Sequence, residues 1–271
     1  MKVFVVLVSL FVLIAAIPLM ADEVFEATSS HRNISKSVSM SISNKVRADV
    51  NRTHKRVYDG LNLSGTYEWA TDIESTLSLG WVKFFTQEKK VIPQDIQIGI
   101  RHSKLYIDEP MGISLYGMGD LFFPLSREER VNRSRLLTIN PGFGLSKSIL
   151  AFSMGYEFSG AYFIHRYRTA KNGSSNAHYG MTNSLLAGYN FTDHVKLQTL
   201  WSLVNLATYG KTPEITYSFG QTLSYKVLPS FKVSAGLTTG GKAFKNNGEE
   251  LNLSLFNVKG TEAILGTEIT F

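Results

Sequence analysis

The stretch Ala263-Ile264-Leu265-Gly266-Thr267-Glu268-Ile269-Thr270-Phe271 decides the fold. Leu265, Ile269 and Phe271 share one parity, and Gly, Glu and Thr occupy positions between them. A period of two is typical of a β-strand that lies between an apolar and a polar environment. In a membrane-spanning barrel the last strand pairs with the first, and an aromatic at its end anchors at the lipid interface. We therefore predict that this stretch closes such a barrel.

The same alternation is found near the other end of the sequence. Residues 34–50 carry apolar side chains at most even positions and mainly Ser, Lys and Arg at odd positions. Strands of soluble proteins usually have about five or six residues, whereas a tilted strand that crosses a bilayer needs about ten. The length of the alternation therefore favours a strand that crosses a membrane.

The pattern recurs along the rest of the chain, with short turns and longer loops in alternation. It predicts an all-β fold, a transmembrane antiparallel up-and-down β-barrel of about 12 strands, with short turns at the periplasmic end. One of these turns is expected at Ser146-Lys147-Ser148. The boundary between the last loop and the final strand, at residues 251–259, stays open. The alternative is a soluble β-sandwich, which would need shorter strands and protected edges.

The N-terminal residues have the pattern of an export signal. Lys2 precedes an apolar run of about fifteen residues, which Pro18 ends, and Ala21 offers a small residue for cleavage. Such a run is too short to be a good membrane span. We predict a cleaved signal peptide at residues 1–21, a periplasmic segment at 22–33 and the barrel at 34–271. An uncleaved N-terminal anchor is the alternative.

The composition of the chain excludes other ways of attachment to a membrane. The 271 residues include no Cys, which excludes a lipoprotein anchor and disulfides, and the formal net charge is +6. Beyond the predicted signal there is no run of eighteen apolar residues, so a helical span is not expected. A chain of this kind can cross a membrane only as a closed barrel, because lipid satisfies no backbone hydrogen bonds.

Function is expected on the polar face of the strands. Ser, Thr, Gly, Asn and Gln dominate this face, and small polar side chains leave room for water. We interpret it as the wall of a narrow pore, and Arg101 and Glu157 as a pair at mid-depth. The alternative is a salt-bridge network that plugs the lumen. The candidate pore-lining residues are Lys45, Arg47, Glu68, Arg101, Asp120, Glu157, Lys196, Lys226, Lys232, Glu262 and Glu268.

The final stretch resembles the C-terminal signal of bacterial outer-membrane proteins, with Leu265, Ile269 and Phe271 at the matching positions. This resemblance implies recognition by the outer-membrane assembly machinery. In size and strand count the chain is similar to the small monomeric twelve-stranded porins for acidic oligosaccharides, although its inner face lacks their dense arginine tracks. That similarity implies a monomer in a Gram-negative outer membrane, surrounded by outer-membrane lipid and lipopolysaccharide.

The predicted outer loops are rich in cations. A positive mouth would concentrate anions, whereas the same cations could bind the phosphates of lipopolysaccharide, and the sequence leaves both interpretations open. The loop cations are Arg52, Lys55, Arg56, Lys89, Lys90, Arg127, Arg130, Arg133, Arg166, Arg168, Lys171, Lys211, Lys242 and Lys245.

We predict a porin-like channel for passive diffusion of small hydrophilic solutes, anions among them, and neither a cofactor nor a nucleic-acid partner. An outer-membrane lipid-modifying enzyme is one alternative, and it would need a nucleophile beside a histidine. His102 with Ser103, and His178 with Asn183 and Ser184, are the only candidate sets, and adjacent strand residues such as His102 and Ser103 point to opposite faces. The six His are too dispersed to suggest a metal site. A structural or adhesive barrel with a closed lumen is the other alternative.

Overall fold

A computed structural model describes residues 38–50, 57–85, 90–210, 213–244 and 260–271. The predicted signal peptide and periplasmic segment lie outside these residues, and so does the open boundary at 251–259. No helix in the described part of the chain is long and apolar enough to cross a membrane.

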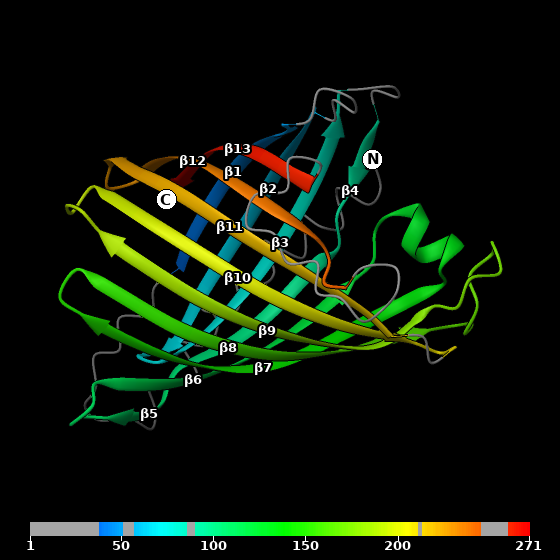
Figure 1. Ribbon diagram of the computed structural model, residues 1–271, viewed down its shortest axis with the longest axis horizontal. Helices are drawn as coiled ribbons and strands as arrows, with labels where there is room; N and C mark the ends of the chain where they lie inside the picture. Colours follow the sequence, from blue (N-terminus) through cyan, green and yellow to red (C-terminus); the bar gives the residue numbers. More distant parts are fainter. Residues whose placement is uncertain (1–37, 51–56, 86–89, 211–212, 245–259) are drawn as a thin grey trace, which may run out of the picture. The chain divides into compact units, whose positions relative to one another are not determined.

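The described residues form thirteen strands and one short π-helical turn (Figure 1). In chain order these are β1 (Val38–Asp49), β2 (Val57–Ala70), β3 (Ile73–Phe84), β4 (Val91–Pro93), β5 (Ile96–Asp108), β6 (Ile113–Phe123), η1 (Glu128–Asn132), β7 (Arg135–Ile149), β8 (Phe152–His165), β9 (Ala177–Asn190), β10 (Val195–Thr208), β11 (Pro213–Leu228), β12 (Phe231–Lys242) and β13 (Thr261–Thr270).

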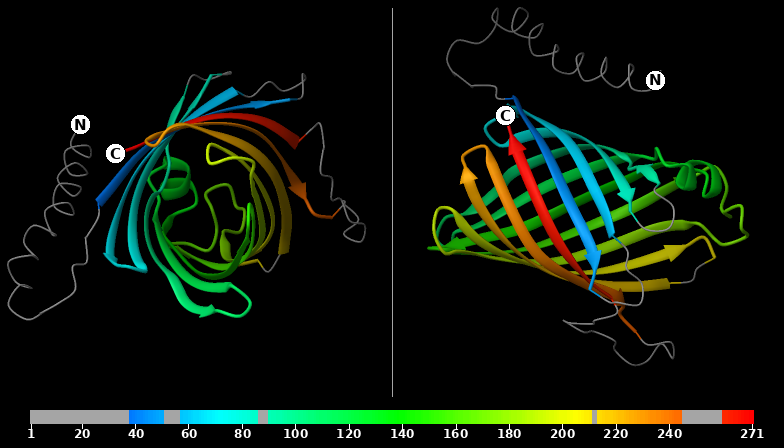
Figure 2. Two further views of the ribbon diagram at one scale, coloured as in Figure 1. Left: turned by 90° about the vertical axis from the view of Figure 1, so that its left-hand side faces the viewer. Right: turned by 90° about the horizontal axis from the view of Figure 1, so that it is seen from above.

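Twelve of these strands form a closed antiparallel barrel (Figure 2). Each long strand pairs with its neighbours along the chain, β3 pairs with β5, and β1 pairs with β13. The short strand β4 adds only to the outer end of β3. Closure satisfies the backbone hydrogen bonds of every barrel strand without leaving a free edge. The predicted fold class is therefore confirmed.

The C-terminal strand closes the barrel as its pattern predicted. In the register of β13 with β1, Leu265 lies opposite Val46 and Gly266 lies opposite Lys45. The pairing extends to the last residue, because the Phe271 amide donates to the Met40 carbonyl at 2.8 Å. The Met40 amide donates in return to the Phe271 carbonyl at 3.2 Å.

The two faces of the barrel differ in chemistry. The outward parity carries large apolar side chains that are substantially exposed, such as Leu185, Leu223 and Leu265, the last of them 64% exposed. The inward parity carries small polar residues, and Ser184 Oγ lies 2.8 Å from Ser202 Oγ. A continuous exposed apolar band is unfavourable in water and suits the hydrocarbon of a bilayer.

The turn predicted at Ser146-Lys147-Ser148 is wrong. Strand β7 continues to Ile149, with Ser148 opposite Ser153 in β8, and the chain turns at residues 150–151. Leu150, with φ of 53°, takes the left-handed conformation that this tight turn requires. Serines on the inward face of a strand have the same composition as a loop, so composition placed the turn too early.

Gly236 in β12 is required by a close approach between strands. A Cβ at this position would collide with the backbone oxygen of Gln221 and lie 3.1 Å from Thr222 Cα. We expect Gly236→Ala to lower the free energy of unfolding in detergent by about 1–3 kcal/mol, as overpacking does. The matched control is Gly119→Ala, whose Cβ would meet nothing nearer than Ile100 Cγ2 at 3.9 Å. Equal denaturation midpoints for the two variants would contradict the prediction.

Candidate functional site

The inward face of the barrel encloses a cavity of about 620 Å³. Strands from around the barrel contribute to its lining, and most lining residues are small or polar. The charged residues that line it are Lys45, Arg47, Arg101, Lys196, Lys232 and Glu268. Cations therefore outnumber carboxylates in this lining, and all six were candidate pore-lining residues.

Lysines gather on the wall formed by β1 and β10–β13. Lys226 lies directly opposite Lys232, and both line a second cavity of about 490 Å³ together with Lys196. Lys232 Nζ forms an ion pair of 2.7 Å with Glu268. In the part of the chain that the structure describes, Lys45, Lys196 and Lys226 form no ion pair. Like charges directly opposite each other on a sheet repel, so Lys226 and Lys232 do not stabilise their strand pair.

Arg101 and Glu157 are joined through Tyr116. The Arg101 guanidinium carbon lies 4.5 Å from the centroid of the Tyr116 ring, and the Tyr116 hydroxyl donates to Glu157 Oε2 at 3.1 Å. The ring lies across Gly144 of β7, where a Cβ would collide with it. Tyr116 was not among the residues predicted from the sequence. Its signal is an aromatic residue on the polar parity of a strand, opposite a glycine.

A second Arg–Tyr–Glu cluster lies on β13, β1 and β2. The Tyr58 hydroxyl donates to Glu262 Oε2 at 2.9 Å, and Arg47 Nη1 lies 3.8 Å from the same oxygen. The Arg47 guanidinium carbon is 5.9 Å from the centroid of the Tyr58 ring. Arg47 and Glu262 were candidates, whereas Tyr58 was not. Both clusters restrain a carboxylate on the inward face.

The remaining candidates also lie on the inward parity. Asp120 accepts a hydrogen bond of 2.9 Å from Gln97 Nε2. Glu68 lies opposite Glu74 in the register of β2 and β3. Lining of a conducting pore stays a prediction for the whole set.

The three residues of the proposed assembly signal lie on the outward parity of β13. Leu265 and Ile269 are 64% and 40% exposed, and Phe271 is 72% exposed. Their backbone pairing places them at the seam between the first and last strands. Recognition by the assembly machinery stays a prediction.

Two outer segments are bonded to each other at one end of the barrel. The Lys171 amide donates to the Asn132 carbonyl at 2.9 Å, and Asn176 Nδ2 donates to the Arg133 carbonyl at 2.8 Å. Arg135 binds Asp95 and also Glu129, the latter at 3.3 Å. Viewed along the barrel, η1 and the segment between β8 and β9 overlap the interior of the ring of strands (Figure 2, left), and Figure 1 places both at the outer end.

The candidate enzymatic residues do not form a nucleophile system. His178 stacks on Tyr209 with ring centroids 4.4 Å apart, while the Ser184 hydroxyl is bonded to Ser202. His102 lies on the outward parity opposite Gly117, and its neighbour Ser103 has the other parity. Within the described ranges, no group of three or more His, Asp or Glu could hold a metal ion.

No protein-family model and no curated protein sequence matches this chain. Solved structures do resemble it. An outer membrane channel from Pseudomonas putida has a TM-score of 0.59 at 11% identity, over 89% of this chain and 97% of that chain. The fold is that of small outer-membrane porins. The NanC porin has a TM-score of 0.57 at 9% identity, over 85% of this chain and 98% of that chain. The KdgM porin has a TM-score of 0.51 at 11% identity, over 85% of this chain and 99% of that chain.

Proposed function

We propose that this protein is a passive channel of a bacterial outer membrane that favours small hydrophilic anions. One chain is sufficient, because the twelve-stranded barrel closes on itself around its own cavity. The observation that carries the proposal is the charge of this cavity, in which five cationic side chains accompany one carboxylate. A low-dielectric wall of one sign raises the local concentration of counter-ions.

The pairing of the charges supports the same preference. The carboxylates of Glu157, Glu262 and Glu268 each accept a hydrogen bond or ion pair from a neighbouring side chain. Lys45 and Lys196 lack such a partner among the described residues. The lysines without a carboxylate partner therefore lie together on one wall of the lumen.

The fold and the outward face support the location. The outward residues form an apolar band, and the neighbours in fold are outer-membrane channels and porins. The predicted signal peptide would supply export to the periplasm. We propose small hydrophilic anions as the class of solute, since no residue pattern selects one anion among them.

The test is the reversal potential of single channels in a planar bilayer under a salt gradient. We expect steady unitary currents that favour the anion. The double variant Lys45→Gln/Lys196→Gln should lower the ratio of anion to cation permeability by roughly threefold, because it removes two unpaired charges from the lumen. The matched control is Lys83→Gln/Lys147→Gln, which removes two charges from the outward parity.

Two results would overturn the proposal. Inserted protein that carries no current would show a closed lumen and would favour a structural or adhesive barrel. Equal permeability ratios in the wild type and both double variants would show that the lumen lysines do not set selectivity.

A further inference from the structure

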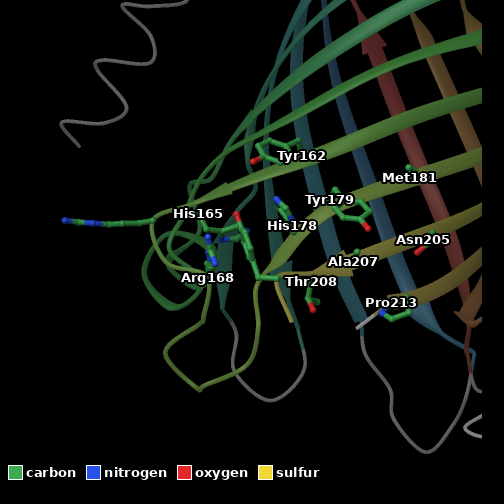
Figure 3. Close-up of a pocket in the computed structure, with 12 residues that line it drawn as sticks. Tyr162, His165, Arg168, His178, Tyr179, Met181, Asn205, Ala207, Thr208 and Pro213 are labelled. Carbon is green, nitrogen blue, oxygen red and sulfur yellow. The ribbon is translucent and has the colours of Figure 1, made fainter. Parts of the chain in front are cut away.

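A groove of about 990 Å³ lies near the outer ends of β8–β11 (Figure 3). Its floor includes Tyr162, Tyr179 and Met181, which are 48%, 48% and 46% exposed. Tyr162 lies directly opposite Tyr179 in the β8–β9 register, so both rings have the parity of the lipid-facing residues. The floor is therefore apolar and aromatic, and it faces away from the lumen.

The rim of this groove is cationic. Arg166 and Arg168 follow the end of β8 directly, both line the groove, and both are exposed. Neither pairs with a carboxylate within the described ranges. Arg168 lies over the Tyr209 ring at 5.8 Å, and the His178 ring stacks on Tyr209 and is tilted against Tyr162. Two guanidinium groups thus stand where the strands leave the apolar band.

The groove also contains a polar side chain in an apolar setting. Asn205 is exposed on the outward parity of β10, opposite Met181, and it lines the floor. Its side-chain amide has no hydrogen-bond partner in the described part of the protein. In hydrocarbon such an amide costs free energy unless a ligand supplies a partner.

We propose that this groove binds a phosphorylated glycolipid of the outer leaflet, of the lipid A type. The phosphate binds Arg166 and Arg168, because guanidinium groups form paired, charge-assisted hydrogen bonds with phosphate oxygens. An acyl chain packs along Tyr162 and Tyr179, and the Asn205 amide bonds the carbonyl of an acyl linkage. A ligand with an acidic head and an apolar tail matches the two halves of the groove. The proposal is independent of channel function, since Tyr162, Tyr179 and Asn205 have the outward parity.

Native mass spectrometry of the purified barrel in detergent tests the proposal, with diphosphorylated lipid A as the added probe. The wild type should retain one lipid A at low probe concentration. Arg166→Gln/Arg168→Gln should weaken binding by roughly tenfold or more, because it removes two charge-assisted contacts. The matched control, Arg127→Gln/Arg130→Gln, removes the same charge from the η1 segment at the same end and should bind as the wild type does.

Two further binding measurements test the choice of lipid and the role of the aromatic floor. Phosphatidylglycerol should bind at least roughly tenfold more weakly than lipid A, because it lacks the second phosphate and the sugar. Tyr179→Ala should also weaken lipid A binding, through the loss of apolar contact. Retained heat-dependent mobility on a gel shows that each variant is folded. Equal affinity for the two lipids, an equal loss in both arginine pairs, or no lipid A on the wild type would overturn the proposal.

Discussion

Tyr116→Ala is expected to raise single-channel conductance roughly twofold, because conductance follows the width and polarity of the narrowest part of a pore. The Tyr116 ring extends across β7 over Gly144 and reaches Glu157 in β8. It is also held from the other side by Arg101. A bulky side chain that is fixed at both ends within the lumen occupies space permanently, and alanine would return this space to water and ions.

A conservative variant separates the ring from its hydroxyl. Tyr116→Phe keeps the ring over Gly144 but leaves the carboxylate of Glu157 without its donor. We expect conductance near that of the wild type, together with a weaker preference for anions. Tyr189→Ala removes the same side chain from the outward face and should leave both quantities unchanged. If Tyr116→Ala conducted like the wild type, this cluster would not be the narrowest part of the path.

The architecture could be predicted from the sequence because a barrel strand has one simple rule. A period of two, sustained for longer than a soluble strand requires, assigns every residue to one of two faces. The rule alone assigns Lys45, Arg101 and Lys232 to the inward face. It also identified the closing strand, since the parity of Leu265 and Phe271 shows which side of β13 meets lipid.

The same rule says nothing about contacts between strands. Tyr116 meets Glu157 because the register places Gly144 opposite Tyr116 and Glu157 opposite Gly144. Register depends on the stagger of the whole barrel, which no local pattern contains. The groove near the outer ends of β8–β11 was missed for a related reason, since alternation treats Tyr179 as one more lipid-facing residue.

The contacts of the charged residues in the outer loops also could not be predicted from composition. Arg135 is engaged by Asp95 and Glu129, and Arg133 Nε lies 3.7 Å from Glu129 Oε1. These cations hold the outer segments together instead of adding to a positive mouth. Arg166 and Arg168 differ because they lack carboxylate partners in the described residues. Both interpretations of the loop cations stay predictions, and several of those cations lie outside the described ranges.

Removal of Phe271 is expected to lower the fraction of the exported protein that assembles into the outer membrane. Most of the wild type should assemble, and only a minor fraction of the deletion variant. The residue forms two backbone hydrogen bonds with Met40 at the seam of the barrel, and its ring is 72% exposed on the outward parity. An aromatic ring at the end of a membrane strand prefers the lipid–water interface. The deletion therefore removes an interfacial anchor, two closing hydrogen bonds and the last residue of the proposed assembly signal.

The measurement is the fraction of protein in the outer-membrane fraction that migrates as a folded band before boiling. Phe271→Tyr keeps an aromatic ring and the backbone pairing, so it should assemble normally. Phe271→Ser keeps the pairing alone and should assemble poorly in cells while it refolds in detergent nearly as well as the wild type. That contrast separates recognition of the C-terminal residue from its contribution to stability. Normal assembly of Phe271→Ser in cells would show that backbone closure alone is sufficient, and it would remove Phe271 from the assembly signal.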